Sequence, residues 1–206
     1  MDKSDKTHQI VSILMKEARY SMAHGHFEVA VLKLHCCLQL EDEPKGRLPI
    51  LDDLGYCFLK LGWFEDAVKI YKQYLKLFPS DNDGRFFLAS TYASLKWTSD
   101  AIGELRTLLA SNPNDVLARH DLALCYRTMG WMKESLEEMK IAHTKAMIYG
   151  NPEEKEIVIT SLAHLEHEIE NGDEDGFEKA FIFFILLIVI NKGRKVRLQK
   201  LRKDQR

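Results

Sequence analysis

The sequence is poor in the residues that mark fibrous or low-complexity proteins. Its 206 residues include only five prolines and eleven glycines, which excludes a collagen-like chain and most low-complexity classes. The net charge at pH 7 is −2, so the chain as a whole has no positive field that would attract nucleic acid. Its first residues contain no apolar stretch with a cleavage site, so we expect no secretory signal peptide. With 46% hydrophobic and 29% charged residues, the sequence predicts a soluble cytoplasmic protein of one or two domains.

Motifs of catalysis and of metal binding are missing as well. The sequence has no GxGxxG, no HExxH, no GxSxG and no GxxxxGK followed by serine or threonine. Four cysteines, Cys36, Cys37, Cys57 and Cys125, form no CxxC pair, and we expect them to be buried, reduced thiols. We therefore expect a protein that is not an enzyme, with no catalytic residue, no cofactor and no metal site.

Much of the sequence repeats with a period of 34 residues. Leucine recurs at this step, and so do small residues, tyrosine or phenylalanine, and all three tryptophans. The matching sets are Leu54, Leu88 and Leu122; Gly55, Ala89 and Ala123; Phe58, Tyr92 and Tyr126; and Trp63, Trp97 and Trp131. A period of this length is typical of repeat proteins, in which each unit is one small supersecondary motif.

Each unit has the pattern of two short helices. Between residues 48 and 61, apolar residues recur at steps of three and four, which places them on one helical face. Gly62 interrupts this pattern, and a second apolar face then continues to Pro79, where the helix is expected to end. Residues 43–49 contain two prolines and a glycine and are expected to form a loop. A further amphipathic helix is expected at 153–170. The fold class is therefore all-α, with about ten helices.

These residues resemble the tetratricopeptide repeat (TPR) family. The resemblance is carried by Leu54-Gly55, Phe58, Gly62, Phe64, Ala67, Tyr71 and Pro79, and by their counterparts in the next two units. It implies a right-handed superhelical solenoid of about four helix-turn-helix repeats with a C-terminal capping helix pair. The expected domains are a repeat domain at 1–150, with units at about 11–44, 48–81, 82–115 and 116–149; a degenerate fifth repeat or capping helices at 151–191; and a basic tail at 192–206.

The resemblance also implies a binding site, because the first helices of successive repeats in this family line a concave groove that binds peptides. The groove positions are Met15, Arg19, Met22, Asp52, Tyr56, Leu59, Phe86, Ser90, His120, Leu124 and Arg127. Some members bind a peptide carboxylate with paired lysine, asparagine and arginine, whereas acidic and aromatic residues stand at those places here. We therefore expect a hydrophobic peptide or helix as ligand. The alternative is that some of these side chains only fill the interior.

The three tryptophans precede the second helices of their units, and repeat geometry would align them along one edge. Trp63, Trp97 and Trp131 would then form a contact edge, since tryptophan is enriched at interface hot spots. The alternative is that each ring only packs on the neighbouring turn.

The C-terminal part combines an apolar run with a strongly basic tail. Residues 180–190 are eleven consecutive apolar residues, about half of what a membrane-spanning helix needs. Residues 192–206 hold eight basic residues and one acidic residue, a net charge of +7. The apolar run is either a buried cap, an interface for self-association, or a contact with a membrane surface. We therefore expect a non-enzymatic adaptor, scaffold or chaperone-like module that binds a protein segment in its groove. The alternative is a membrane-associated scaffold held by 177–206; a nucleic-acid partner is not expected.

Overall fold

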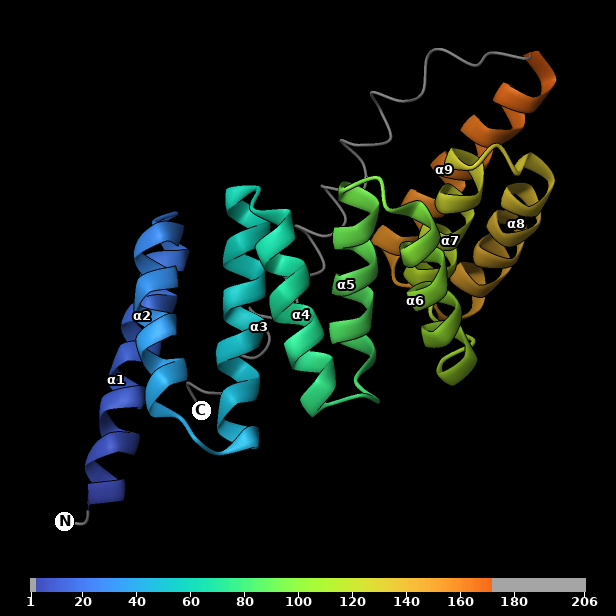
Figure 1. Cartoon of the computed structure of the whole chain (residues 1–206). Coiled ribbons are helices and arrows are strands. Elements are labelled where there is room, and N and C mark those ends of the chain that lie inside the picture. Colours follow the sequence, from blue (N-terminus) through green and yellow to red (C-terminus); the bar gives the residue numbers. More distant parts are fainter. Residues whose placement is uncertain (1–2, 172–206) are drawn as a thin grey trace. The chain divides into compact units, whose positions relative to one another are not determined.

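The computed structural model describes residues 3–171, and this part of the chain is built of helices joined by short turns (Figure 1). The helices are α1 (Lys3–Ala23), α2 (Phe27–Leu40), α3 (Pro44–Leu61), α4 (Phe64–Leu77), α5 (Asn82–Ser94), α6 (Thr98–Ser111), α7 (Val116–Thr128), α8 (Met132–Tyr149) and α9 (Pro152–Asn171). The described residues contain no strand. The prediction of an all-helical repeat fold is confirmed.

The helices fall into two compact units, one made of residues 1–84 and one that begins at Arg85. In the first unit α2 packs between α1 and α3, and α4 packs against α3. The leucine that recurs at 34 residues lies in the cores, since Leu54 is 0%, Leu88 2% and Leu122 3% exposed. The recurring leucine therefore marks the buried side of the first helix in each hairpin.

One turn geometry is repeated between the two helices of every hairpin. Gly25, Gly62 and Gly130 have positive φ angles of 80°, 74° and 75°, and Lys96 occupies the same place with φ 60°. In each case the next residue donates its backbone N–H to the carbonyl five residues earlier; for Trp63 the acceptor is Phe58 at 2.9 Å. Because glycine adopts the left-handed region without a Cβ penalty, this turn explains Gly25 before His26, Gly62 before Trp63 and Gly130 before Trp131.

The loop predicted for residues 43–49 is wrong, because α3 begins at Pro44 and passes through Pro49. A proline at the first helical position has a suitable φ and lacks only an N–H that would have no helical partner. The backbone N–H of Arg47 donates to the carbonyl of Glu43 at 3.1 Å and closes the first turn. The buried carboxylate of Glu41 accepts the N–H of Glu43 at 3.0 Å, which places negative charge at the start of this helix.

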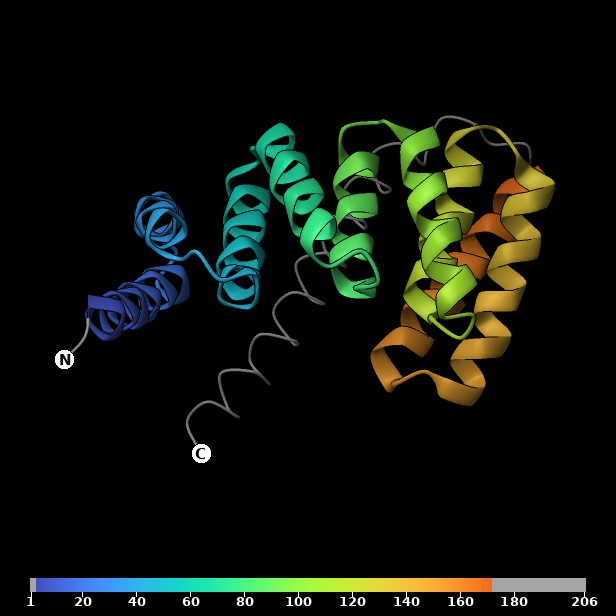
Figure 2. The same ribbon diagram turned by 60° about the horizontal axis from the view of Figure 1, so that its bottom comes forward.

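In the second unit α7 packs against α6, α8 and α9 (Figure 2). Asp115 caps α7 by accepting the N–H of Ala118 at 3.0 Å, and ten of the thirteen α7 residues are buried. The helix predicted at 153–170 is confirmed by α9, which begins at Pro152 and ends at Asn171. None of the helices in residues 3–171 combines the length and the apolar character needed to span a membrane. The apolar run at 180–190 and the tail at 192–206 lie outside the described residues.

The expectation of four buried thiols is wrong for one cysteine. Cys37, Cys57 and Cys125 are buried, but the neighbouring Cys36 is exposed on α2. Adjacent side chains on a helix point about 100° apart. Because Cys37 faces the core, its neighbour Cys36 faces solvent.

Candidate functional site

The residues predicted for a binding groove divide into an accessible set and a buried set. In the first unit, Arg19 and Met22 of α1 and Asp52, Tyr56 and Leu59 of α3 are all partly exposed. Met15 of α1 is 9% exposed and belongs to the buried set. We call the five partly exposed residues the α1–α3 surface. The steps of three and four between Asp52, Tyr56 and Leu59 place them on one side of α3.

An ion pair joins the two helices of this surface. The Nε of Arg19 donates to Oδ2 of Asp53 at 2.9 Å, with side-chain exposures of 31% and 5%. The arginine therefore covers a carboxylate that is otherwise buried in α3. Because a buried carboxylate without a partner is costly, this pair fixes α1 against α3 and keeps the two helices in register.

Tyr56 lies at the centre of the α1–α3 surface. Its ring meets the ring of Phe27 edge-on, with 6.1 Å between centroids, and the ammonium of Lys60 lies 5.4 Å from its centroid. These contacts support the ring from two sides while the residue stays partly exposed. An aromatic ring that is held in place and still accessible loses little conformational entropy when a ligand packs on it, which is a property of interface hot spots.

The predicted groove residues of the second unit are mostly interior. Phe86 and His120 are 0% exposed, Ser90 3% and Leu124 5%. A ligand would reach these side chains only if the helices around them moved. The sequence pattern shows that these positions are on the first helices of their hairpins, but it does not show that α9 lies across α7.

One of these buried groove residues, His120, forms a hydrogen-bonded network with two other buried residues, and the network joins α7 to α9. The Nδ1 of His120 is 3.0 Å from Oδ1 of Asp121, and its Nε2 is 2.9 Å from Oγ of Ser161. A carboxylate only accepts, so Nδ1 donates to Asp121, and Nε2 shares a hydrogen bond with the serine hydroxyl. These are the residue types of a hydrolytic triad, but all three are buried, with Ser161 the most exposed at 9%. With so little access for a substrate, these three side chains form a polar link between the two helices.

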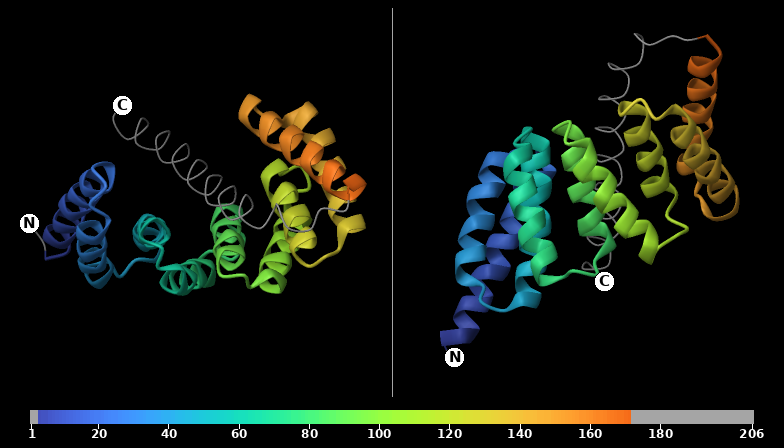
Figure 3. Two further views of the ribbon diagram at one scale, coloured as in Figure 1. Left: turned by 90° about the horizontal axis from the view of Figure 1, so that it is seen from above. Right: turned by 45° about the vertical axis from the view of Figure 1, so that its right-hand side comes forward.

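A second link between the same helices involves the remaining groove residue. The Nε of Arg127 lies 2.6 Å from Oε2 of Glu168 on α9, with side-chain exposures of 8% and 14%. Burial lowers the pKa of Arg127, and the charge of Glu168 acts in the opposite direction. The hydrogen bonds of His120 and this ion pair together join α9 to the side of α7 on which the groove was predicted. Figure 3 shows α9 beside α7.

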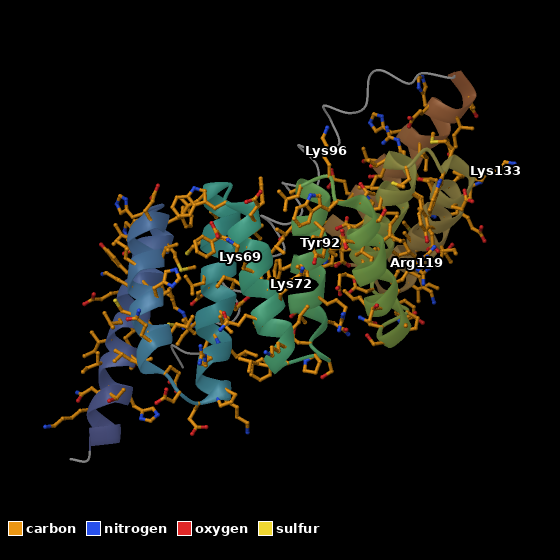
Figure 4. All side chains as sticks on the ribbon, in the orientation of Figure 1. Lys69, Lys72, Tyr92, Lys96, Arg119 and Lys133 are labelled. Carbon is orange, nitrogen blue, oxygen red and sulfur yellow. The ribbon has the colours of Figure 1, made fainter. Side chains whose placement is uncertain are left out.

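The three tryptophans are nearly half exposed, at 47%, 46% and 43% for Trp63, Trp97 and Trp131. Each packs on an aromatic ring of its own hairpin, with 5.9, 5.8 and 5.7 Å between centroids. An open cavity of about 480 Å³ lies beside Trp97, at the turn that Lys96 marks in Figure 4. Its lining comprises Lys96, Trp97, Thr98, Ser99, Asp100 and Met129.

Within residues 3–171, no group of three or more histidine, cysteine, aspartate or glutamate side chains has a geometry that would hold a metal ion.

Comparison with family models found a match over a single repeat unit. Residues 48–81 match the family model described as the tetratricopeptide repeat. Comparison with curated protein sequences found no match.

Solved structures similar to this chain are helical repeat proteins. The MamA protein is 18% identical, with 91% of this chain and 96% of that chain covered and a TM-score of 0.66. The TPR2B domain of yeast Sti1, in complex with pHsp70, is 22% identical over 55% of this chain and 91% of that chain, with a TM-score of 0.52. The type III secretion translocator chaperone SycD of Yersinia enterocolitica is 19% identical over 61% and 88%, with a TM-score of 0.56. At these identities the likeness shows the fold.

Proposed function

We propose that this chain, of which residues 48–81 match the tetratricopeptide-repeat model, is a non-enzymatic interaction module that binds a segment of another protein on the α1–α3 surface. The observation that carries the proposal is the division of the groove residues. Those of the first unit are accessible around a supported tyrosine, whereas most of those in the second unit are buried. The Sti1 domain in complex with pHsp70 supports the same class of function by analogy of fold.

The chemistry of the surface favours an apolar ligand with few charges. Met22, Tyr56 and Leu59 offer thioether, aromatic and aliphatic contacts, and the charge of Arg19 is already directed at Asp53. The positions that would bind a terminal carboxylate hold Asp52 and its neighbour instead. We therefore expect an amphipathic peptide or helix that presents its apolar side, and no preference for a free C-terminus.

A phage-displayed library of random peptides, selected on the full-length protein, tests this proposal without a known partner. Enriched peptides should carry apolar residues at helical or alternating spacing. The variants Tyr56→Ala and Leu59→Asp should each weaken binding about tenfold or more, the loss expected when a hot-spot contact of roughly 1.4 kcal/mol is removed. Leu77→Asp is the matched control, because Leu77 is a 36% exposed leucine at the end of α4. Full affinity in both surface variants would contradict the proposal.

The tryptophan edge is the second candidate surface, and the cavity beside Trp97 is the observation that favours it. A ligand bound there would lose affinity in Trp97→Ala and keep it in Tyr56→Ala. The two surfaces are therefore separated by one pair of variants.

A further inference from the structure

The side of α7 that the repeat pattern assigns to a groove is occupied by a helix of this same chain. His120, Leu124 and Arg127 follow one another at steps of four and three, which places them on one side of α7. His120 and Leu124 are 0% and 5% exposed, and the side chain of Arg127 is 8% exposed. We call these three residues the α7 stripe. Two of them contact α9, so the contacts of α9 show what kind of helix the stripe accepts.

α9 meets the α7 stripe in a regular register. Oγ of Ser161 lies 2.9 Å from Nε2 of His120, and Oε2 of Glu168 lies 2.6 Å from Nε of Arg127. From the first contact to the second, each helix advances by seven residues, which is about two turns. The two helices therefore run in the same direction, and one face of α9 lies along the stripe.

Two apolar residues complete the inward face of α9. Val158 and Leu165 are 0% and 1% exposed, and with Ser161 and Glu168 they fall at steps of three and four along the helix. The face thus reads, in order, apolar residue, hydroxyl, apolar residue and carboxylate. A helix that lacked the hydroxyl or the carboxylate would leave polar groups of α7 buried without a partner, which is costly. The stripe therefore selects among apolar helices by these two polar positions.

α9 is held by far fewer buried side chains than the helix it covers. Of the α9 side chains that the structure describes, only Val158, Ser161 and Leu165 are buried, whereas ten of the thirteen α7 residues are buried. An element with few buried apolar contacts opens at a lower free energy than the rest of its unit. We therefore expect α9 to leave the stripe more easily than α7 leaves the core.

The start of α9 is capped by its own residues. The N–H of Asn151 donates to Oε2 of Glu154 at 3.0 Å, and Oδ1 of Asn151 accepts the N–H groups of Glu153 and Glu154, each at 3.0 Å. These reciprocal bonds stabilise a helix end without help from other helices. A separate peptide with the α9 sequence therefore keeps the local signals that start the helix.

We propose that the α7 stripe, with the side of α8 that packs on α9, is a binding site for a helix of a partner protein, which takes the place of α9. The partner helix carries the pattern of α9: an apolar residue, serine or threonine three residues later, a second apolar residue after four more, and a carboxylate after a further three. This inference goes beyond the proposed function, because the α7 stripe and the α1–α3 surface belong to different compact units.

The chemistry of the stripe disfavours a membrane or a nucleic acid as its ligand. Both present many phosphates and are bound through accessible positive charge, whereas the one arginine of the stripe is buried and directed at a single carboxylate. The α9 helix of a second copy has the right pattern by definition. The size of the protein in solution distinguishes that occupant from a partner.

The probe is an N-acetylated peptide of residues 151–171 with a fluorophore at its C-terminus, and its binding to the full-length protein is measured by fluorescence anisotropy. The wild type should bind it weakly, because its own α9 is linked to the site and competes at a high effective concentration. Val158→Asp/Leu165→Asp in the chain should release α9 and bind the peptide at least tenfold more tightly, since apparent affinity rises with the fraction of open sites.

The same helix provides a matched control. Ile159 and Ile169 are 47% and 43% exposed, so Ile159→Asp/Ile169→Asp adds the same two charges to the outward side of α9. This variant should bind the peptide as weakly as the wild type does. Circular dichroism should show native helix content in the control and in the release variant.

The ion pair gives a second release variant and a test of specificity. Glu168→Lys in the chain sets a like charge against Arg127 while the apolar contacts stay, and it should also bind the native peptide at least tenfold more tightly than the wild type. A peptide with Glu168→Lys should bind the Val158→Asp/Leu165→Asp protein about tenfold more weakly than the native peptide does. Adding Arg127→Glu to that protein should restore its binding.

Four results would overturn the proposal. The stripe does not accept a separate helix if the folded release variants bind the peptide no better than the wild type. The contact is not specific if the Glu168→Lys peptide binds as well as the native peptide. If neither release variant keeps native helix content, α9 is an obligatory part of the core and no partner displaces it. If light scattering shows a dimeric wild type and monomeric release variants, the α9 helix of a second copy occupies the site.

Discussion

Replacing Gly55 with alanine would place a methyl group against the ring of Tyr71, where α3 meets α4. A Cβ at Gly55 would lie 2.5 Å from Cζ and 2.8 Å from Cε1 and Oη of that ring. Carbon atoms pack best at about 3.5–4.0 Å, so the two groups cannot occupy these positions together. Tyr71 is 0% exposed, so its ring has no open space into which it can turn. The strain must therefore spread into the packing of the two helices.

Two opposing effects set the size of the change. Overpacking a close-packed core costs about 1–3 kcal/mol, whereas alanine gains roughly 1 kcal/mol over glycine inside a helix. Because the clash involves a buried ring, we expect the strain to be near the top of its range. The net destabilisation is then about 1–2 kcal/mol, or roughly 2–8 °C in Tm for a chain of this length.

The chain provides both a matched control and a rescue. Gly103 is exposed within α6, and nothing lies within 4 Å of a Cβ placed there, so Gly103→Ala should stabilise by about 0.5–1 kcal/mol. The next repeats have alanine in place of Gly55 and the smaller or more flexible Leu105 and Met139 in place of Tyr71. The double variant Gly55→Ala/Tyr71→Leu should therefore be more stable than the sum of its single changes predicts, by about 0.5–3 kcal/mol.

Urea unfolding followed by circular dichroism measures the wild type, Gly55→Ala, Tyr71→Leu, the double variant and Gly103→Ala. If Gly55→Ala were as stable as Gly103→Ala, or if the double variant showed simple additivity, the close approach of α3 and Tyr71 would not be the reason for the glycine.

Three further predictions concern strain, charge and thiol chemistry. Lys96→Gly should stabilise by about 0.5–1 kcal/mol, because glycine adopts the positive φ of this turn without a Cβ penalty; a lowered Tm would contradict this. Arg127→Met should destabilise by roughly 3–5 kcal/mol in urea unfolding, because it leaves its carboxylate partner on α9 buried without a counter-charge; an unchanged midpoint would show that α9 does not depend on the pair. Burial, with the neighbouring Cys36 thiolate, raises the pKa of Cys37 from 9.0 to about 11. The folded protein therefore holds this proton more tightly than the unfolded chain, so the stability from this group is present below pH 9 and is lost as pH rises toward 11. Cys37→Ala should flatten that alkaline decline, and a decline of equal slope would refute the assignment.

The sequence predicted the hairpins because their determinants are local and repeated. The buried leucine at 54, 88 and 122 fixes the core side of each first helix, and the glycines at 62 and 130 fix the turn. At residues 43–49 composition was misleading. The same prolines that favour a loop are compatible with a helix when the first stands at its first position and Glu41 covers its start.

The accessibility of the candidate site could not be predicted in the same way. The positions of Tyr56 and Leu124 in their hairpins are similar, but Leu124 is buried while Tyr56 stays partly exposed. The His120–Ser161 and Arg127–Glu168 contacts that join α7 to α9 cross 41 residues each, and no local pattern reports them. One chemical signal in the sequence could have indicated these contacts. A histidine and an arginine on the apolar side of a repeat helix need polar partners, and α9 has a serine and a glutamate on one of its faces.

Site-specific photo-crosslinking tests the central claim, that a protein ligand binds on the α1–α3 surface, most directly. A benzophenone amino acid is placed at Leu59, at Leu77 or at Trp97 of the full-length protein, which is then irradiated with a peptide selected from the phage library. The crosslinked residue and the peptide residue are mapped by mass spectrometry. The account predicts a crosslink from position 59 and none from positions 77 and 97. A crosslink from position 97 with none from position 59 would contradict it and would assign the ligand to the tryptophan edge.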